Sequence, residues 1–235
     1  MQINEYKDIF HFWQLDNLLS LEEEATSTDI HRDDKPFIAA KIEEEEKKKA
    51  NISFQFNGRV PSPWDGNLRK AKIVICYANP ASNDDHLVHR KLMLKQLSGN
   101  APLPTDIPEW KEWYEKKKFS TLQENFDRSD EICVFNLCPY ASLNMSDVNW
   151  RVASCLPSIW WAQKHLREVL IPDAFDKKIF LVVARAHQRW GIQHWGEIDS
   201  FRQGNLRIQN GRGGYIREDI ACDFKKWKLR PTVST

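Results

Sequence analysis

The sequence predicts an α/β fold in which a central parallel sheet of about four strands has helices on both faces. The first indication is a set of three continuous apolar runs, Lys72–Tyr77, Glu131–Leu137 and Lys178–Ala184, because strands covered on both faces are apolar throughout. The second is the order of the elements: stretches with helical apolar spacing separate these runs, as in a wound sheet with right-handed crossovers. The expected helices are Leu87–Leu97, Trp110–Lys118 and Val152–Val169.

A weaker strand and an N-terminal segment complete the expected fold. Residues Asn205–Gln209 alternate apolar and polar side chains, which is typical of a strand nearer the edge of a sheet. The stretch EYKDIFHFWQLDNLLSLEEEA has helical apolar spacing, and KIEEEEKKKA places four glutamates about one turn before three lysines, as on a solvated helical face. We therefore expect residues 1–60 to form a helical extension packed on an α/β domain of residues 61–235.

Composition and charge restrict the class of protein. The chain has 235 residues, of which 41% are hydrophobic and 29% charged, as in ordinary soluble proteins. Its net charge of +1 argues against a purely electrostatic nucleic-acid binder, so any site for a polyanion must be a local patch. The first residues do not resemble a signal peptide, and no apolar run approaches the ~18 residues of a membrane span. We expect a cytoplasmic monomer without a membrane partner.

The five cysteines indicate reduced thiols rather than a metal site. None of them forms a C-x-x-C pair. Cys76, Cys133 and Cys138 lie in or beside strand-like runs, where cysteine behaves as a small buried hydrophobe. The spacing required for zinc or an iron–sulfur cluster is missing, so we expect no metal, no iron–sulfur cluster and no other cofactor.

Polar residues follow each expected strand where its apolar body ends. The segments are Tyr77–Pro80, Asn136–Ser142, Arg185–Trp190 and Gln209–Tyr215. Because the carboxyl ends of parallel strands lie at one edge of a sheet, we expect these segments to converge on a ligand pocket.

Each of these segments also has a purely structural interpretation. Asn79-Pro80 is a common start of a turn, and Asn136 is suited to cap a helix or bond to the backbone. His187 is suited to a core position, and the glycines after Gln209 to an ordinary loop, since they have neither P-loop nor GxGxxG order. The joint pattern favours a site.

Two of the segments resemble motifs of the uracil-DNA glycosylase superfamily. The stretch PWDGNLRKAKIVICYANPASNDD resembles its opening, where a strand ends in a G-x-N-P-G or G-x-D-P-Y type motif, and VFNLCPY resembles its second strand. The resemblance covers about Pro61 to Ile220. There are two departures: Ala81 replaces the usual glycine after Asn-Pro, and IQNGRGGYI stands where the superfamily has an H-P-S type segment.

The resemblance implies a role for each matching residue. Asn79 would position the attacking water, since a neutral amide orients a water but does not act as a strong base. Asn136 would read the edge of the base, and His187 would assist the leaving group. Further candidates are Asp84 and Asp85 for basicity, with Tyr77, Ala78, Pro80, Tyr140, Gln209 and Asn210 around the base and Ser82, Arg185, Arg212 and Arg217 for DNA contacts.

The function implied is that of a monofunctional DNA glycosylase with DNA as its partner. Such an enzyme flips a nucleotide from the stack and hydrolyses its N-glycosidic bond, leaving an abasic site. Members of the superfamily that act against phages excise hypermodified cytosines, and the polar fourth segment favours this substrate over uracil. Uracil repair remains an alternative, as does a non-catalytic module that binds nucleotides or modified DNA, because fold does not establish activity.

Overall fold

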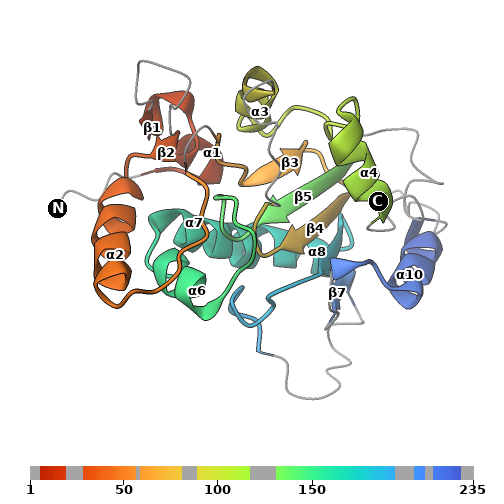
Figure 1. The fold of residues 1–235 in the computed structure, drawn as a ribbon. Helices are drawn as coiled ribbons and strands as arrows, with labels where there is room; N and C mark the ends of the chain where they lie inside the picture. Colours follow the sequence, from red (N-terminus) through yellow and green to blue (C-terminus); the bar gives the residue numbers. More distant parts are fainter. Residues whose placement is uncertain are drawn as a thin grey trace.

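A computed structural model describes residues 6–19, 29–56, 59–80, 89–116, 131–193, 204–209 and 214–228. Within these ranges, a five-stranded sheet has the order β3-β5-β4-β6-β7, and all its pairings are parallel except that of β3 with β5. Figure 1 shows the sheet in the middle of the molecule with helices around it. The strands are β3 (Trp64–Gly66), β4 (Ile73–Tyr77), β5 (Ile132–Asn136), β6 (Phe180–Val183) and β7 (Leu206–Ile208).

The three apolar strands predicted from the sequence are confirmed as adjacent and parallel. The central strand β4 pairs with β5 on one side and β6 on the other, and β7 lies at an edge as expected. Strand β3 was not predicted, so the sheet has five strands rather than about four. It contains Asp65 and Gly66, which have low strand propensity, and its conformation follows from pairing with β5.

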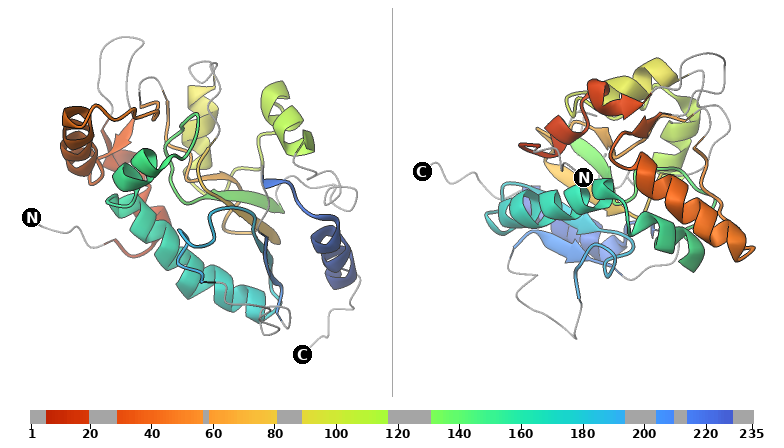
Figure 2. Two further views of the ribbon diagram at one scale, coloured as in Figure 1. Left: turned by 60° about the horizontal axis from the view of Figure 1, so that its bottom comes forward. Right: turned by 90° about the vertical axis from the view of Figure 1, so that its left-hand side faces the viewer.

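The side chains of the strands alternate between two covered faces. On one face, Cys76 and Leu181 belong to a buried cluster with residues of α6, α7 and α8. On the other face, Ile75 and Val182 pack with residues of α4 and α10. The left view of Figure 2 shows the run from α7 to α8 along one side of the sheet and α10 on the other. These helices are α4 (Pro108–Lys116), α6 (Asp147–Ala153), α7 (Pro157–His165), α8 (Ile171–Phe175) and α10 (Glu218–Lys228).

The N-terminal segment contains less helix than its apolar spacing suggests. Helix α1 ends at Phe12, and Asn17 Nδ2 donates to the terminal carbonyl oxygens of His11 and Phe12, both at 3.0 Å. Phe12 and Trp13 belong to the same buried cluster as Cys76. The segment contains α1 (Ile9–Phe12), the 3₁₀ turn η1 (Leu15–Asn17), the antiparallel strands β1 (Leu18–Leu19) and β2 (Ile30–His31), and α2 (Lys35–Lys47).

Helix α2 confirms the helix expected from the glutamate–lysine run. The ammonium groups of Lys47 and Lys48 lie 2.7 and 2.6 Å from the carboxylates of Glu43 and Glu44, each one turn earlier. A boundary between two domains at residue 60 stays a prediction, although α1 contributes to the core of the sheet.

The single helix expected over Val152–Val169 is wrong, because the chain turns between two helices there. Helix α6 ends at Ala153, and α7 begins at Pro157, whose missing N–H is tolerated only in the first turn. Leu156, just before the proline, has the extended backbone that this position favours. After α7 the chain continues through one π-helical turn, η2 (Leu166–Leu170), into α8.

The remaining described helix, α3 (Arg90–Gln96), is a short part of the helix expected over Leu87–Leu97. Among the helices that the structure describes, none has both the length and the apolar character needed to cross a membrane.

Candidate functional site

The polar segments that follow β4, β5 and β6 line adjoining cavities at the carboxyl edge of the sheet. A small cavity of about 40 Å³ lies between the sheet and α4, and its lining includes Asp65, Asn79 and Asn136. A second cavity of about 240 Å³ shares Asn79 with it, and a third of about 730 Å³ shares Arg185 with the second. Gln209, directly after β7, also lines the third cavity, so the expected convergence is confirmed for the described residues at all four strand ends.

Asn79 is held in one orientation at the boundary of the first two cavities. Its Nδ2 donates to the Pro80 carbonyl oxygen at 2.8 Å and to Ser142 Oγ at 3.0 Å. Ser142 Oγ in turn donates to the carbonyl oxygen of Asn144 at 2.8 Å, so it has to accept from Asn79. Asn79 Oδ1 receives no hydrogen bond from any described residue. This carbonyl oxygen can therefore accept a hydrogen bond from a water molecule or a ligand.

Asn136 presents its amide to the small cavity from the end of β5. It is 2% exposed, and its Nδ2 donates to the Ser62 carbonyl oxygen at 2.9 Å. Its backbone N–H donates to the carbonyl oxygen of Pro63, which fixes the strand end. Oδ1 and the second Nδ2 hydrogen have no partner among the described residues, so the amide offers one acceptor and one donor to a ligand.

Asp65 is a site residue that the sequence reading missed. It is paired with Val134 across β3 and β5, so its carboxyl group lies on the same face of the sheet as Asn136. Ser62 Oγ donates to Asp65 Oδ1 at 2.8 Å, whereas Oδ2 has no donor among the described residues. Burial raises the pKa of Asp65 to about 6, and the Ser62 hydrogen bond opposes this shift. A carboxyl group with such a pKa changes charge close to neutral pH.

The small cavity is covered by aromatic side chains of α4. Trp110, Trp113 and Tyr114 line it, and the Trp113 ring contacts the Tyr77 ring with the centroids 5.4 Å apart. A cavity of about 40 Å³ has room for about one water molecule and not for a ring-shaped ligand. A larger ligand needs more room than the cavity has in this structure.

The second cavity contains the predicted residues Tyr77, Ala78 and Pro80 together with Leu143. Leu143 is 73% exposed at this cavity. The Tyr77 hydroxyl is turned away and donates to the Gly214 carbonyl oxygen at 2.5 Å. Gly214 has a φ of +68°, and a Cβ there would lie 2.6 Å from the Tyr77 ring, so only glycine allows this approach.

The third cavity contains Arg185 and His187 from the segment after β6, as the convergence of strand ends predicts. Arg185 is exposed and is shared with the second cavity. Ala186 between them has a φ of +57°, a strained backbone for a residue with a Cβ. His187 therefore lines the third cavity, which adjoins the second cavity, where Asn79 lies.

Gln209, which follows β7, lines the third cavity, and its hydrogen bonds hold the chain near Tyr215 and Arg217. The Gln209 amide donates to the Tyr215 carbonyl oxygen at 2.7 Å and accepts from the Arg217 N–H. The Arg217 guanidinium forms an ion pair with Asp219 at 2.8 Å.

The interpretation of Tyr140 as a base-stacking residue is not supported by its position. Its side chain is 3% exposed, and its hydroxyl donates to Asp34 Oδ2 at 2.7 Å. The ring contacts Phe56 of the N-terminal segment, with the centroids 5.4 Å apart. Tyr140 therefore fixes the N-terminal segment to the loop after β5.

Five further predicted residues lie outside the described part of the chain, namely Ser82, Asp84, Asp85, Asn210 and Arg212. Their roles stay predictions.

The cysteines have the distribution expected from the sequence. Cys76, Cys133 and Cys138 are buried, and burial raises the pKa of the Cys138 thiol to about 12. In the described ranges, no three histidine, cysteine or acidic residues are grouped as metal ligands would be. The chemistry available at the site is thus that of amides, one carboxyl group, a histidine and exposed arginine.

The chain matches no protein-family model, no curated protein and no solved structure.

Proposed function

We propose that the protein is a monofunctional DNA glycosylase that hydrolyses the N-glycosidic bond of a flipped, hypermodified cytosine. The observation that carries this proposal is the group of three polar side chains, Asp65, Asn79 and Asn136, that line one cavity at the carboxyl edge of the sheet. Each has an oxygen atom without a hydrogen-bond donor among the described residues. Such side chains are prepared to bind a polar ligand rather than to stabilise the empty fold.

Asn79 supplies the positioning of the attacking water. Its Oδ1 accepts a hydrogen bond from the water, while the bond from Nδ2 to Ser142 prevents the amide from turning. The water adds to C1′ of the sugar as the C1′–N bond breaks, the base leaves with the electrons of that bond, and the proton that the water loses is balanced by the proton that the departing base takes up. The cost of ordering the water is small because the protein has already fixed the amide.

Asp65 favours cytosine over uracil as the base. Above a pH of about 6 its carboxylate accepts a hydrogen bond from the 4-amino group of a cytosine, whereas the 4-oxygen of uracil would face a like negative charge. Asn136 supplies a donor and an acceptor for the remaining edge of the ring. Together these groups are complementary to a cytosine edge.

The second and third cavities suit a substituent on the base. They continue from Asn79 through Ala78 to His187 and have volumes of about 240 and 730 Å³. Their amide and guanidinium groups are of the kind that bind sugar hydroxyls. Entry of the base itself needs more room than the small cavity has, which an outward movement of α4, of the kind that many enzymes use, would provide.

Leu143 is suited to occupy the space that the base leaves in the stack. Apolar side chains that proteins insert between base steps stabilise unstacked DNA. An exposed leucine beside Asn79 is in the position for this role.

Release of the base is the test. The protein is incubated with duplexes that contain glucosylated hydroxymethylcytosine, uracil or unmodified cytosine, and free base and abasic sites are measured. We expect release from the first duplex and little from the third. Release from the uracil duplex alone would instead establish the repair function, and binding of modified DNA without release would establish a non-catalytic module.

A further inference from the structure

A second site lies on the other side of α3, away from the cavity that contains Asn79. Helix α3 contributes Met93 to the small cavity, while Leu94 and its lysines line an open hollow of about 1070 Å³ between α3 and α1. The two sites therefore share a helix but use opposite sides of it. None of Asp65, Asn79 or Asn136 lines the hollow.

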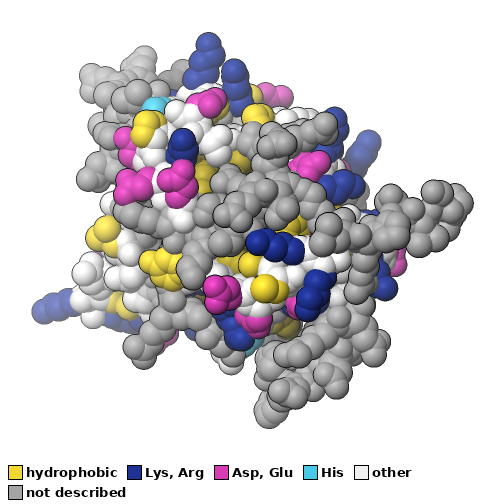
Figure 3. Space-filling model, turned by 90° about the vertical axis from the view of Figure 1, so that its right-hand side faces the viewer, with side chains coloured by type: hydrophobic (Ala, Val, Ile, Leu, Met, Phe, Trp, Pro, Cys, Tyr) yellow, Lys and Arg dark blue, Asp and Glu magenta, His cyan; other side chains and the backbone are white. Residues whose placement is uncertain are grey.

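The hollow is strongly basic in a chain that is almost neutral. Lys7, Arg69, Lys91 and Lys95 line it, against the single carboxylate of Asp8. The whole chain has a net charge of only +1, so this lining is more basic than the chain as a whole. On the face in Figure 3, by contrast, basic and acidic side chains are interspersed. A local cluster of one sign attracts ligands of the opposite sign.

The cations of the hollow are available for a ligand. No ion pair joins Lys7, Lys91 or Lys95 to an acidic side chain in the described parts of the chain. The one carboxylate, Asp8, accepts a hydrogen bond from the His11 backbone N–H at 2.7 Å and caps α1. A polyanion can therefore bind without first displacing a partner of these lysines.

Arg69 is held in place before any ligand binds. Its guanidinium carbon lies 3.7 Å from the centre of the Phe10 ring, and its Nε donates to the Ser98 carbonyl oxygen at 3.2 Å. The Nη atoms have no partner among the described residues and remain for an anion. Stacking on an aromatic ring and a fixed fork of donors are the features that make arginine a good phosphate ligand.

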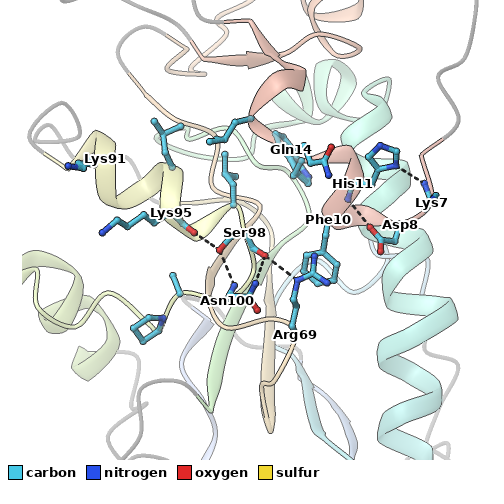
Figure 4. A pocket seen from close by; sticks show the side chains of 16 residues that line it. Lys7, Asp8, Phe10, His11, Gln14, Arg69, Lys91, Lys95, Ser98 and Asn100 are labelled. Atoms are coloured by element: carbon cyan, nitrogen blue, oxygen red, sulfur yellow. Dashed lines mark hydrogen bonds between the residues drawn. The ribbon is translucent and has the colours of Figure 1, made fainter.

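The arrangement suits an extended ligand better than a single ion. Figure 4 shows Arg69 against Phe10 in the hollow, with Lys91 and Lys95 on one side and Lys7 on the opposite side. The accessible apolar part of the lining is formed by Phe10, Leu15, Leu94 and Pro102. A nucleic-acid strand has this combination of regularly spaced phosphates and apolar ring faces.

We propose that this hollow binds the phosphate backbone of a nucleic-acid strand, as a contact site separate from the proposed catalytic cavity. The lysines and Arg69 hold phosphates, and the apolar lining contacts sugars or bases. The site does not depend on the proposed glycosylase activity, because binding of a strand requires no chemistry.

The test is binding of a fluorescent, unmodified 20-nucleotide DNA strand to the full chain between 50 and 200 mM salt. Lys91→Glu with Lys95→Glu should weaken binding about tenfold at the lowest salt and reduce the slope of log affinity against log salt by about 1.4. The matched control, Lys225→Glu with Lys226→Glu on α10, changes the net charge equally and should leave the affinity within about twofold. Melting temperatures establish that both variants are folded.

Equal affinities of the α3 variant and the wild type would overturn the proposal, as would equal losses in the α3 variant and the α10 control. Binding that is as tight for a mononucleotide as for the 20-mer would overturn the assignment to a strand. So would tighter binding of poly-L-glutamate than of DNA, which would indicate an acidic peptide. If the protein releases the base but the α3 variant binds the strand as the wild type does, only this inference is overturned. If the α3 variant weakens strand binding but the wild type releases no base, only the proposed activity is overturned.

Discussion

Burial raises the pKa of two aspartates, Asp34 and Asp65, to about 6, yet the surroundings of their carboxyl groups differ. Asp34 is fully buried, and both its oxygens accept hydrogen bonds, one from the Tyr140 hydroxyl at 2.7 Å and one from the Ser158 N–H at 3.0 Å. Asp65 has one oxygen bonded to Ser62, and its other oxygen has no donor among the described residues.

Both ring nitrogens of His31, which lies beside Asp34, also have hydrogen-bond partners. Its ring is buried and stacked on Phe12, with the centroids 3.7 Å apart. Nδ1 accepts from the Asp33 N–H, and Nε2 lies 2.8 Å from the Phe12 carbonyl oxygen, so the ring is neutral with its proton on Nε2. Burial lowers the pKa of His31 to about 4.

The comparison teaches that a shifted pKa does not by itself mark a functional site. Both carboxyl oxygens of Asp34 have a donor, so the hydrogen bonds hold one arrangement of the N-terminal segment. Around Asp65 the polar atoms are incompletely paired and face a cavity, so the cluster is prepared for a ligand. The two carboxyl groups thus differ in their donors: both oxygens of Asp34 are bonded, and only one oxygen of Asp65 is.

The largest effect is expected from Asn79→Ala. Base release should fall by about a hundredfold or more, because the attacking water loses its positioning group. The melting temperature and DNA affinity should stay close to those of the wild type, since Asn79 is only partly buried. An unfolded variant would show instead that Asn79 is a structural turn residue, and normal release would mean that the water is held elsewhere.

Asp65→Asn should change specificity more than rate. The new Nδ2 can donate to the 4-oxygen of uracil, so the preference for cytosine over uracil should fall by about tenfold or more. In the wild type, the pKa of Asp65 is raised to about 6, so this preference should grow as the pH rises through 6, where the carboxyl group ionises. The ratio of release rates for the two bases between pH 5 and 8 measures both effects. A preference that is unchanged by the substitution would remove Asp65 from the base site.

Tyr140→Phe should affect stability and not base release. Asp34 loses one of its hydrogen bonds, which should cost about 1–3 kcal/mol of unfolding free energy. The cost should be larger at pH 8 than at pH 5, because the raised pKa keeps Asp34 protonated below about 6, and only the ionised form depends strongly on the lost donor. Urea unfolding at both pH values gives the difference. Loss of base release at normal stability would restore Tyr140 as a base contact.

Leu143→Ala is expected to have the smallest effect. Release from a duplex should fall about fivefold, because nothing replaces the flipped base in the stack, while release from a single strand should be nearly unchanged. Rates on duplex and single-stranded substrates of one sequence make the comparison. Equal losses on both substrates would mean that Leu143 shapes the second cavity rather than the DNA.

Local sequence pattern was sufficient for the central sheet and part of the site. The strands that contain Ile75, Val134 and Val182 were predictable because burial on both faces requires continuous apolar residues. Asn79 and Asn136 were predictable because each lies where the apolar body of such a strand ends. These features depend on neighbouring residues alone.

What the sequence did not predict depends on partners that are distant along the chain. The strand state of β3 and the position of Asp65 follow from pairing with β5, nearly seventy residues later, and Asp-Gly has no strand signal of its own. Tyr140 comes shortly after the strand motif, where a residue that contacts the base is expected. The direction of the Tyr140 hydroxyl is instead determined by its bond to Asp34, which lies 106 positions earlier in the chain. Asp65 lies within the stretch that resembles the glycosylase motif, but an aspartate before a glycine is typical of a turn, so the sequence did not indicate its place in the cavity.

The hydrogen bonds of the N-terminal segment also determine when the protein can complete its fold during synthesis. The bond between His31 and Tyr140 spans 109 positions, and that between Asp34 and Ser158 spans 124. A ribosome adds about 5–20 residues per second, so the segment waits roughly 6–25 s for the second of these partners. Until then Phe12 and Trp13 lack part of the surroundings that bury them in the finished protein. A chaperone that binds aromatic side chains would find its first target there.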